Sequence, residues 1–213
     1  MNKRQWLPQS FQILEDFFSQ NGYQFLQIVN QFRKETKGGW QNVILGFGHY
    51  EDCTYVEVSF GSRLNIVEQL IAPYSHGLRG YQAESNTTIT NMAKFQKEAH
   101  LRFEIRDEAD LFRMAAHLRD FFRKEGFAFL DSLSNIGELD KLFNQDPTSA
   151  CLVSFNHQLR SFRALAIASL NQNPNWEELA EYYRGLLDKY SSPKVVIDRF
   201  NDFSRYLATT ALN

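Results

Sequence analysis

The sequence predicts an α+β fold, in which an antiparallel meander sheet packs against helices and is followed by a layer of three helices. Two patterns support this fold class. Residues 23–60 alternate apolar and polar side chains with a period of two, which is typical of strands that bury one face. Residues 108–125 and much of 150–213 instead repeat apolar side chains at helical spacing, which predicts amphipathic helices.

The chain opens with a predicted helix over residues 8–21, which ends at Gly22. Three strands are expected next, and the turn signal Lys37-Gly38-Gly39 joins the first two as a hairpin. These strands are expected at residues 23–34, 40–49 and 54–60.

The middle of the chain predicts shorter elements around a long polar stretch. A short helix is expected at residues 64–71, and the polar stretch covers residues 73–85. Branched side chains favour a strand within residues 87–95, and apolar alternation favours another at residues 100–106.

The best-formed predicted helix spans residues 108–125. Asp107 is expected to be its N-cap, because a carboxylate there accepts hydrogen bonds from backbone N–H groups of the first turn. Gly126 is expected at C′ in the left-handed conformation, which glycine adopts at little cost. Phe122 and Phe127 would then make the apolar contact of a Schellman ending.

The end of this helix repeats a pattern from the first helix. Residues 14–26 read LEDFFSQNGYQFL, and residues 118–130 read LRDFFRKEGFAFL. The similarity has two interpretations, an internal duplication or two amphipathic helices that end in the same way. Strands are expected after the first copy and helices after the second, whereas a repeat should carry the same supersecondary unit. We therefore favour a shared helix ending.

A domain boundary is expected at residues 146–149, where turn-forming residues interrupt the helical pattern. It separates an α+β sheet domain, residues 1–146, from a helical extension, residues 147–213, which we expect to pack on it. Three helices are predicted in the extension, with Asn175 capping the second and Pro193 opening the third.

Composition restricts the class of protein. The 213 residues carry a formal net charge of −2, which argues against a general nucleic-acid binder. Cys53 and Cys151 are the only cysteines, so neither a disulfide framework nor a structural metal site is predicted. We recognise no cofactor motif, signal peptide or apolar membrane span, and therefore expect a cytoplasmic protein without cofactors or membrane attachment.

Several short motifs follow one another in a recognisable order. An opening helix ends in Gly and an aromatic residue, a strand carries Phe and Arg, Gly and Arg stand near the end of the third strand, and a late helix ends near Phe-Leu. The residues concerned are Gly22, Tyr23, Phe32, Arg33, Gly61, Arg63, Phe129 and Leu130. Over about residues 8–143 this order resembles an uncharacterised bacterial family, domain of unknown function 4304. The resemblance implies an α+β fold and no particular activity, because the function of that family is itself unknown.

A candidate binding site is expected in the polar stretch at residues 73–85. His76, Arg79 and Tyr81 lie in it, and Arg63 is close to it in sequence. Loops of this length are uncommon unless they are functional or disordered. Two guanidinium groups near an imidazole can present several donors to an anionic group without requiring a nucleophile. The alternative is a mobile surface loop that carries no site.

Two further groups of residues could support catalysis. His117 and Asp120 lie three residues apart on the predicted helix and could act as a base and its orienting partner. Exposed helix faces often carry such charges without any catalytic role. His49 and Glu57, on neighbouring predicted strands, could line a pocket or simply face water. We assign no catalytic residue from these patterns.

Two functions from different classes follow from the sequence. The first, which we favour, is a non-catalytic module that binds a protein partner or a small anionic ligand, with a homodimer as one arrangement. The alternative is a small-molecule enzyme with its site near Arg63, His76 and Arg79. A concave pocket that holds these side chains would favour the enzyme. A flat aromatic patch or a symmetric dimer would favour the binding module.

Overall fold

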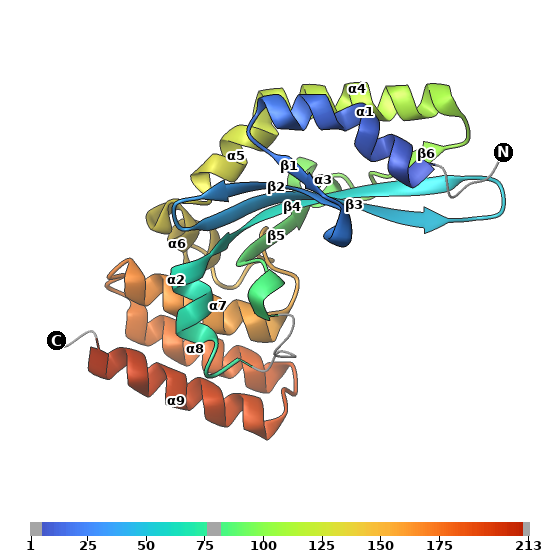
Figure 1. Ribbon diagram of the computed structural model, residues 1–213. Coiled ribbons are helices and arrows are strands. Elements are labelled where there is room, and N and C mark those ends of the chain that lie inside the picture. Colours follow the sequence, from blue (N-terminus) through green and yellow to red (C-terminus); the bar gives the residue numbers. More distant parts are fainter. Residues whose placement is uncertain (1–5, 76–81, 211–213) are drawn as a thin grey trace. The chain divides into compact units, whose positions relative to one another are not determined.

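The computed structural model describes residues 6–75 and 82–210 and confirms the α+β class (Figure 1). The strands are β1 (Gln24–Leu26), β2 (Gln31–Thr36), β3 (Gly39–His49), β4 (Thr54–Leu64), β5 (Thr88–Asn91) and β6 (Phe103–Ile105). The α-helices are α1 (Trp6–Gln20), α2 (Asn65–Ile71), α3 (Met92–Gln96), α4 (Glu108–Phe121), α5 (Phe127–Ser132), α6 (Ile136–Asn144), α7 (His157–Leu170), α8 (Trp176–Lys189) and α9 (Lys194–Thr210). Shorter helical turns are η2 (Gln27–Val29), η3 (Gln82–Glu84) and η4 (Phe122–Gly126).

The chain forms two compact units. The sheet unit comprises Met1–Ser62 and Thr90–Ser132, and the helical unit comprises Arg63–Ile89 and Leu133–Asn213. The chain passes from one unit to the other within β4, within β5 and after α5. The division expected at residues 146–149 stays a prediction, and each compact unit combines segments that are distant in sequence.

The sheet has the strand order β1–β2–β3–β4–β5, and β6 pairs with β4. The pairs β1 with β2, β2 with β3, and β4 with β6 are antiparallel. The hairpin between β2 and β3 turns at Lys37 and Gly38, as predicted, with Thr36 opposite Gly39. The strands expected at residues 40–49 and 54–60 are therefore confirmed as β3 and β4.

The strand expected at residues 23–34 is instead two strands separated by a turn, so this prediction was wrong in its middle. The turn η2 lies between β1 and β2, and Asn30 follows it with a φ of 48°. Asparagine tolerates this left-handed conformation because its short side chain can bond locally to the backbone. The reversal folds β1 back on β2, with Phe25 opposite Phe32.

The predictions for residues 87–95 and 100–106 were correct in type but too long. β5 ends at Asn91, whose side chain accepts a hydrogen bond from the Lys94 N–H at 2.8 Å and starts α3. β6 covers only Phe103–Ile105 and pairs with the first residues of β4. A capping asparagine thus converts the second half of the first segment into a helix.

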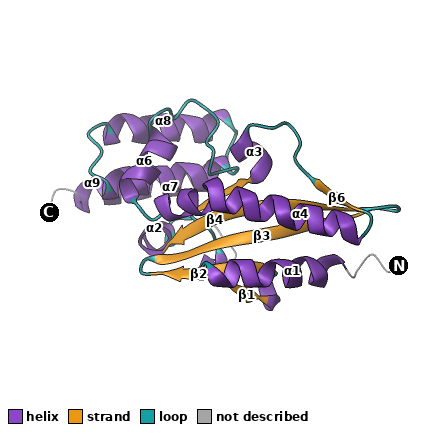
Figure 2. Cartoon of the chain, turned by 90° about the horizontal axis from the view of Figure 1, so that it is seen from above, coloured by secondary structure: helices purple, strands orange, loops and turns teal. Residues whose placement is uncertain are grey.

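Helices α1 and α4 lie side by side across one face of the sheet (Figures 1 and 2). The rings of Phe11 and Phe18 on α1 contact Phe32 of β2 at 5.6 and 4.4 Å between centroids. The guanidinium of Arg119 on α4 donates a hydrogen bond to the Ile13 carbonyl and joins the two helices. The α4 stripe is buried as predicted, at Leu111, Met114, Ala115, Leu118 and Phe121.

Helix α4 begins as the sequence predicts. The Asp107 carboxylate accepts from the Asp110 N–H at 2.9 Å, and the Asp110 carboxylate accepts from the Asp107 N–H at 3.3 Å. The two bonds form a reciprocal capping box, which satisfies backbone donors of the first turn. The Arg106 N–H also donates to Asp110 and holds the pKa of that carboxyl below its ordinary value.

Helix α4 does not end at Gly126, so the Schellman ending predicted there was wrong. The π-helical turn η4 continues α4 into α5. Gly126 is not among the glycines with a positive φ. A Cβ atom on Gly126 would lie 2.5 Å from Cδ1 of Phe122 and 3.0 Å from Cε1 of Phe121. Glycine is therefore required at this position by close packing and not by a left-handed backbone.

A Schellman ending of the kind predicted at Gly126 is found at the end of α1. Gly22 has a φ of 84°, its N–H donates to the Ser19 carbonyl, and the Tyr23 N–H donates to the Phe18 carbonyl. The rings of Phe18 and Tyr23 meet edge to face at 5.8 Å. This is a Schellman motif with its apolar contact. The two similar stretches consequently end differently, and our interpretation of a shared helix ending was wrong.

The helical unit contains the three predicted C-terminal helices, α7, α8 and α9. Helix α7 is buried almost all round, because α2, α6, α8 and α9 all contact it. Asn175 precedes α8 as expected, but its side chain makes no capping hydrogen bond. Within residues 6–75 and 82–210, no helix has both the length and the apolar character that a membrane crossing requires.

Truncation of Phe121 tests the packing of α4 on the sheet. Phe121 is 4 % exposed and lies between the rings of Phe60, Phe95 and Phe122. We expect Phe121→Ala to lower the free energy of unfolding by about 3–5 kcal/mol. The control is Phe112→Ala on the same helix, where the side chain is 54 % exposed and the expected change is within about 0.5 kcal/mol. Equal urea denaturation midpoints for the two variants would contradict this packing.

A comparison of two helical glycines tests the close packing at Gly126. Gly126→Ala places a Cβ against the buried Phe122 ring, and we expect it to lower the free energy of unfolding by about 1–3 kcal/mol. Gly185→Ala in α8 meets no described atom within 4 Å and should stabilise its helix by up to about 1 kcal/mol. Urea denaturation followed by circular dichroism measures both, and stabilisation by Gly126→Ala would disprove the packing argument.

Candidate functional site

One of the four predicted site residues lies in the described part of the chain. Arg63 is the residue before the last of β4. His76, Arg79 and Tyr81 lie outside the described residues, and their assignment stays a prediction. The structure therefore shows the surroundings of Arg63, between the start of α2 and the residues that follow η3.

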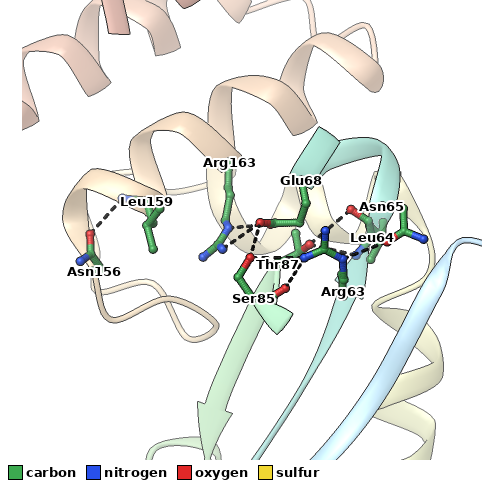
Figure 3. Close-up of polar contacts among 9 residues, drawn as sticks. All are labelled: Arg63, Leu64, Asn65, Glu68, Ser85, Thr87, Asn156, Leu159 and Arg163. Carbon is green, nitrogen blue, oxygen red and sulfur yellow. Dashed lines mark hydrogen bonds and ion pairs between the residues drawn. The ribbon is translucent and has the colours of Figure 1, made fainter. Parts of the chain in front are cut away.

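Arg63 is held by neighbours from two directions (Figure 3). Its Nε donates to Oδ1 of Asn65 at 2.9 Å, at the first position of α2. Its Nη1 donates to the Ser85 carbonyl at 2.8 Å and to the Ser85 hydroxyl at 3.3 Å. The side chain is half-buried. These bonds fix the guanidinium in one orientation at the end of β4.

The backbone next to Arg63 is tied to the same segment. The Leu64 N–H donates to Oγ1 of Thr87 at 2.9 Å. Together with the bonds between Arg63 and Ser85, this contact joins the end of β4 to the residues just before β5. The chain between these ties, residues 65–84, includes α2, η3 and most of the predicted site stretch. These hydrogen bonds therefore hold the two ends of residues 65–84 close together.

A buried ion pair that the sequence analysis missed continues this network. The Arg163 guanidinium on α7 donates to the Glu68 carboxylate on α2, with Nε to Oε1 at 2.8 Å and Nη2 to Oε2 at 3.2 Å. Both side chains are 6 % exposed. The Ser85 hydroxyl donates to Oε2 of Glu68 at 3.0 Å. We call Arg63, Glu68, Ser85 and Arg163 the anchor cluster (Figure 3).

The energetics of the anchor cluster follow from burial. An ionised carboxylate or guanidinium inside a protein is costly unless it is paired and hydrogen-bonded. The two-pronged contact between Arg163 and Glu68 supplies that pairing with the geometry that a guanidinium favours. The sequence carried one usable signal, since α7 places two arginines, Arg160 and Arg163, among apolar side chains that are expected to be buried. Its partner lies 95 residues away, so only the tertiary structure identifies Glu68.

The chemistry open to the cluster is limited. A serine hydroxyl that donates to a carboxylate has the form of a nucleophile beside a base. The Glu68 carboxylate, however, also accepts two hydrogen bonds from Arg163. Its two oxygens are therefore shared between Arg163 and Ser85. The geometry supports positioning of Arg63 better than activation of Ser85.

The first catalytic constellation considered from sequence is not assembled. The His117 ring contacts the Phe103 ring at 5.3 Å between centroids. The Asp120 carboxylate accepts from Nζ of Lys124 at 2.7 Å, in an exposed pair one helical turn apart. No hydrogen bond between His117 and Asp120 is found in the described structure. These contacts agree with a solvated helix face.

His49 and Glu57, the second candidate pair, are also not joined to each other. Nδ1 of His49 lies 3.1 Å from the Thr54 hydroxyl, across the β3–β4 turn. The Glu57 carboxylate pairs with Nε of Arg102 at 2.5 Å, and both side chains are about half exposed. Each residue thus has a partner of its own on the surface of the sheet unit, and neither contact joins His49 to Glu57.

Cysteine and metal chemistry find no support among the residues described. Cys53 and Cys151 are both buried, and they form no disulfide. Burial raises the pKa of the Cys53 thiol, which keeps it in the less reactive protonated form. Across residues 6–75 and 82–210, no three His, Cys, Asp or Glu side chains are grouped so that they could hold a metal ion.

Comparison with known proteins adds no identification. The chain matches no family model, and it is similar to no curated protein and no solved structure.

The anchor cluster predicts a non-additive pair of substitutions. Arg163→Met leaves the Glu68 carboxylate buried without its cation, and we expect a loss of about 3–5 kcal/mol in the free energy of unfolding. Glu68→Leu/Arg163→Met removes both charges and should cost less than Arg163→Met alone, because no buried charge is left unpaired. Urea denaturation of the two single variants and the double variant gives the coupling. Additive losses would show that the two side chains do not stabilise each other.

Proposed function

We propose that this chain is a non-catalytic cytoplasmic module that binds a protein partner or a small anionic ligand. The proposed surface includes Arg63 together with His76, Arg79 and Tyr81. The observation that carries the proposal is the fixed position of Arg63 in the anchor cluster. A guanidinium already held in one orientation loses little freedom on binding, and its planar shape matches carboxylate and phosphate groups.

The construction of the cluster supports a binding role. Arg163 and Glu68 are buried and lie behind Ser85, which in turn holds Arg63 at the surface. Binding residues work best when a second layer of packed and bonded side chains supports them. The ties at Arg63 and Thr87 also hold both ends of the segment that contains the other proposed residues. Binding residues are commonly carried by segments that a rigid scaffold positions.

The proposed location and family rest on separate observations. Two cysteines that form no disulfide fit a reducing compartment such as the cytoplasm. We also propose that the chain belongs to the bacterial family that it resembles, domain of unknown function 4304. The positions of the motif residues in the fold support this proposal. Phe32 and Arg33 are in β2, Arg63 is at the end of β4, and Phe129 is in the late helix α5. These are the kinds of element in which the resemblance places them.

The alternative function is a small-molecule enzyme with its site near Arg63, His76 and Arg79. One observation favours it, the hydrogen bond from the Ser85 hydroxyl to the Glu68 carboxylate. Catalysis there would require the carboxylate to take the serine proton while Arg163 remains bonded to it. We therefore rank this function second.

Ligand screening of an arginine double variant tests the proposed site. We expect inorganic phosphate, sulfate or citrate to raise the midpoint of thermal unfolding of the wild-type chain, because bound ligand stabilises the folded state. Arg63→Ala/Arg79→Ala should lose this shift, and it should also lose any protein captured by the wild-type chain in a pull-down.

The matched control removes the same charge from other surfaces. Arg113 and Arg205 are 69 % and 78 % exposed and each pairs with an aspartate on its own helix. Arg113→Ala/Arg205→Ala should bind as the wild type does. Equal loss by both double variants would indicate a net-charge effect and no site. Turnover of a substrate that depends on His117 and Asp120 would refute the non-catalytic function.

A further inference from the structure

Helix α8 carries an open surface hollow whose residues are distinct from the anchor cluster. The hollow has a volume of about 440 Å³. Its described lining residues are Glu178, Glu181, Tyr182, Gly185, Leu186 and Lys189. All of them belong to α8. A small-molecule site usually encloses its ligand with several elements, whereas a hollow whose described lining comes from one helix has the form that a second helix can occupy.

The spacing of the lining residues defines one seam. Glu178, Tyr182, Gly185 and Lys189 are separated by four, three and four residues. Spacings that alternate between three and four residues place one stripe of a helix against its partner helix in antiparallel and parallel coiled coils. The fully buried side chains of α8, Tyr183 and Leu187, lie on another side of the helix. The seam is therefore additional to the packing of α8 within its own chain.

Gly185 is the residue that makes the hollow. Glycine is among the poorest residues for a helix interior because it has the greatest backbone freedom to lose. Elsewhere in this chain a helical glycine has an internal packing reason, as at Gly126. At Gly185, a Cβ atom would meet no described atom within 4 Å. Packing inside the described protein thus gives no reason for glycine here, whereas a partner helix seated against this position would supply one.

When two copies of α8 run antiparallel, the six lining residues of one copy face complementary lining residues of the other. About a twofold axis at the centre of the seam, Glu178 stands opposite Lys189, Glu181 opposite Leu186, and Tyr182 opposite Gly185. Each acid at one end meets the cation at the other end. Each tyrosine ring meets the space that glycine leaves. A parallel pair would place Glu178 against Glu178 and Lys189 against Lys189, which like-charge repulsion disfavours.

We propose that α8 packs antiparallel against α8 of a second copy of this chain, with Tyr182 of each copy seated in the hollow at Gly185 of the other. The Tyr182 hydroxyl donates to the Pro147 carbonyl at 2.7 Å, so the ring is already oriented as one wall of the hollow.

The size of α8 sets the strength of this dimer. A helix of 14 residues is about 21 Å long, so one antiparallel contact is small for a protein interface. The dimer is therefore weak and depends on protein concentration. The two Glu178–Lys189 pairs are at the edge of the contact, where salt screens them. High salt consequently weakens the dimer.

Analytical ultracentrifugation of the full chain over a range of concentrations tests the proposal. The wild type should form a reversible dimer. Glu178→Lys replaces two attractive pairs by two repulsive ones and should raise the dimer dissociation constant about tenfold. Glu178→Lys/Lys189→Glu restores opposite charges and should recover the wild-type constant. The matched control is Glu177→Lys, which makes the same charge change at a neighbouring exposed position outside the hollow and should leave the constant unchanged.

A second variant tests the fit at the hollow. Gly185→Gln fills the hollow with a residue of high helix propensity, so it should abolish the dimer while the midpoint of thermal unfolding stays equal or rises. A wild-type chain that stays monomeric at every concentration would overturn the proposal. A dimer that Glu178→Lys and Glu177→Lys affect equally, or that Gly185→Gln leaves intact, would place the interface on another surface and would also overturn it.

Discussion

Phe18 is the residue on which the packing of the sheet unit most depends. Its ring stacks on Phe32 of β2 at 4.4 Å and meets Phe122 edge to face at 5.2 Å, and all three side chains are fully buried. A single ring thus connects α1, the sheet and the start of η4. Because aromatic pairs are favourable only in certain orientations, this contact fixes the angle as well as the distance of each element.

This aromatic core explains why two stretches of similar sequence end differently. After Phe18, the chain reverses through the left-handed Gly22 and enters β1, where it joins the sheet. After Phe122, the helix continues, and the Phe127 ring stacks on Tyr23 at 5.5 Å. That contact is available because the end of α1 has placed Tyr23 beside the start of α5. Gly126 leaves room for the Phe122 ring against the backbone and thereby permits the π-helical turn.

The helical unit is held by buried polar contacts as well as by apolar packing. Glu68 and Arg163 join α2 to α7, and they support Ser85, which holds Arg63. Such contacts are directional, and leaving one of their groups unpaired is costly, so they position the surrounding segments closely. The proposed binding role of Arg63 uses this rigidity. The proposed contact at α8 instead uses a surface that the internal packing leaves unfilled.

The sequence by itself determined the features whose signals lie within a few residues. The N-cap at Asp107, the hairpin turn at Gly38 and the C-terminal helices depend on hydrogen bonds between near neighbours, and all were predicted. The candidate position of Arg63 was also recognised from sequence, at the end of a strand. Tertiary structure alone decided the conformation of Gly126 and the partner of Arg163, because ring packing and charge pairing join residues that only the fold brings together.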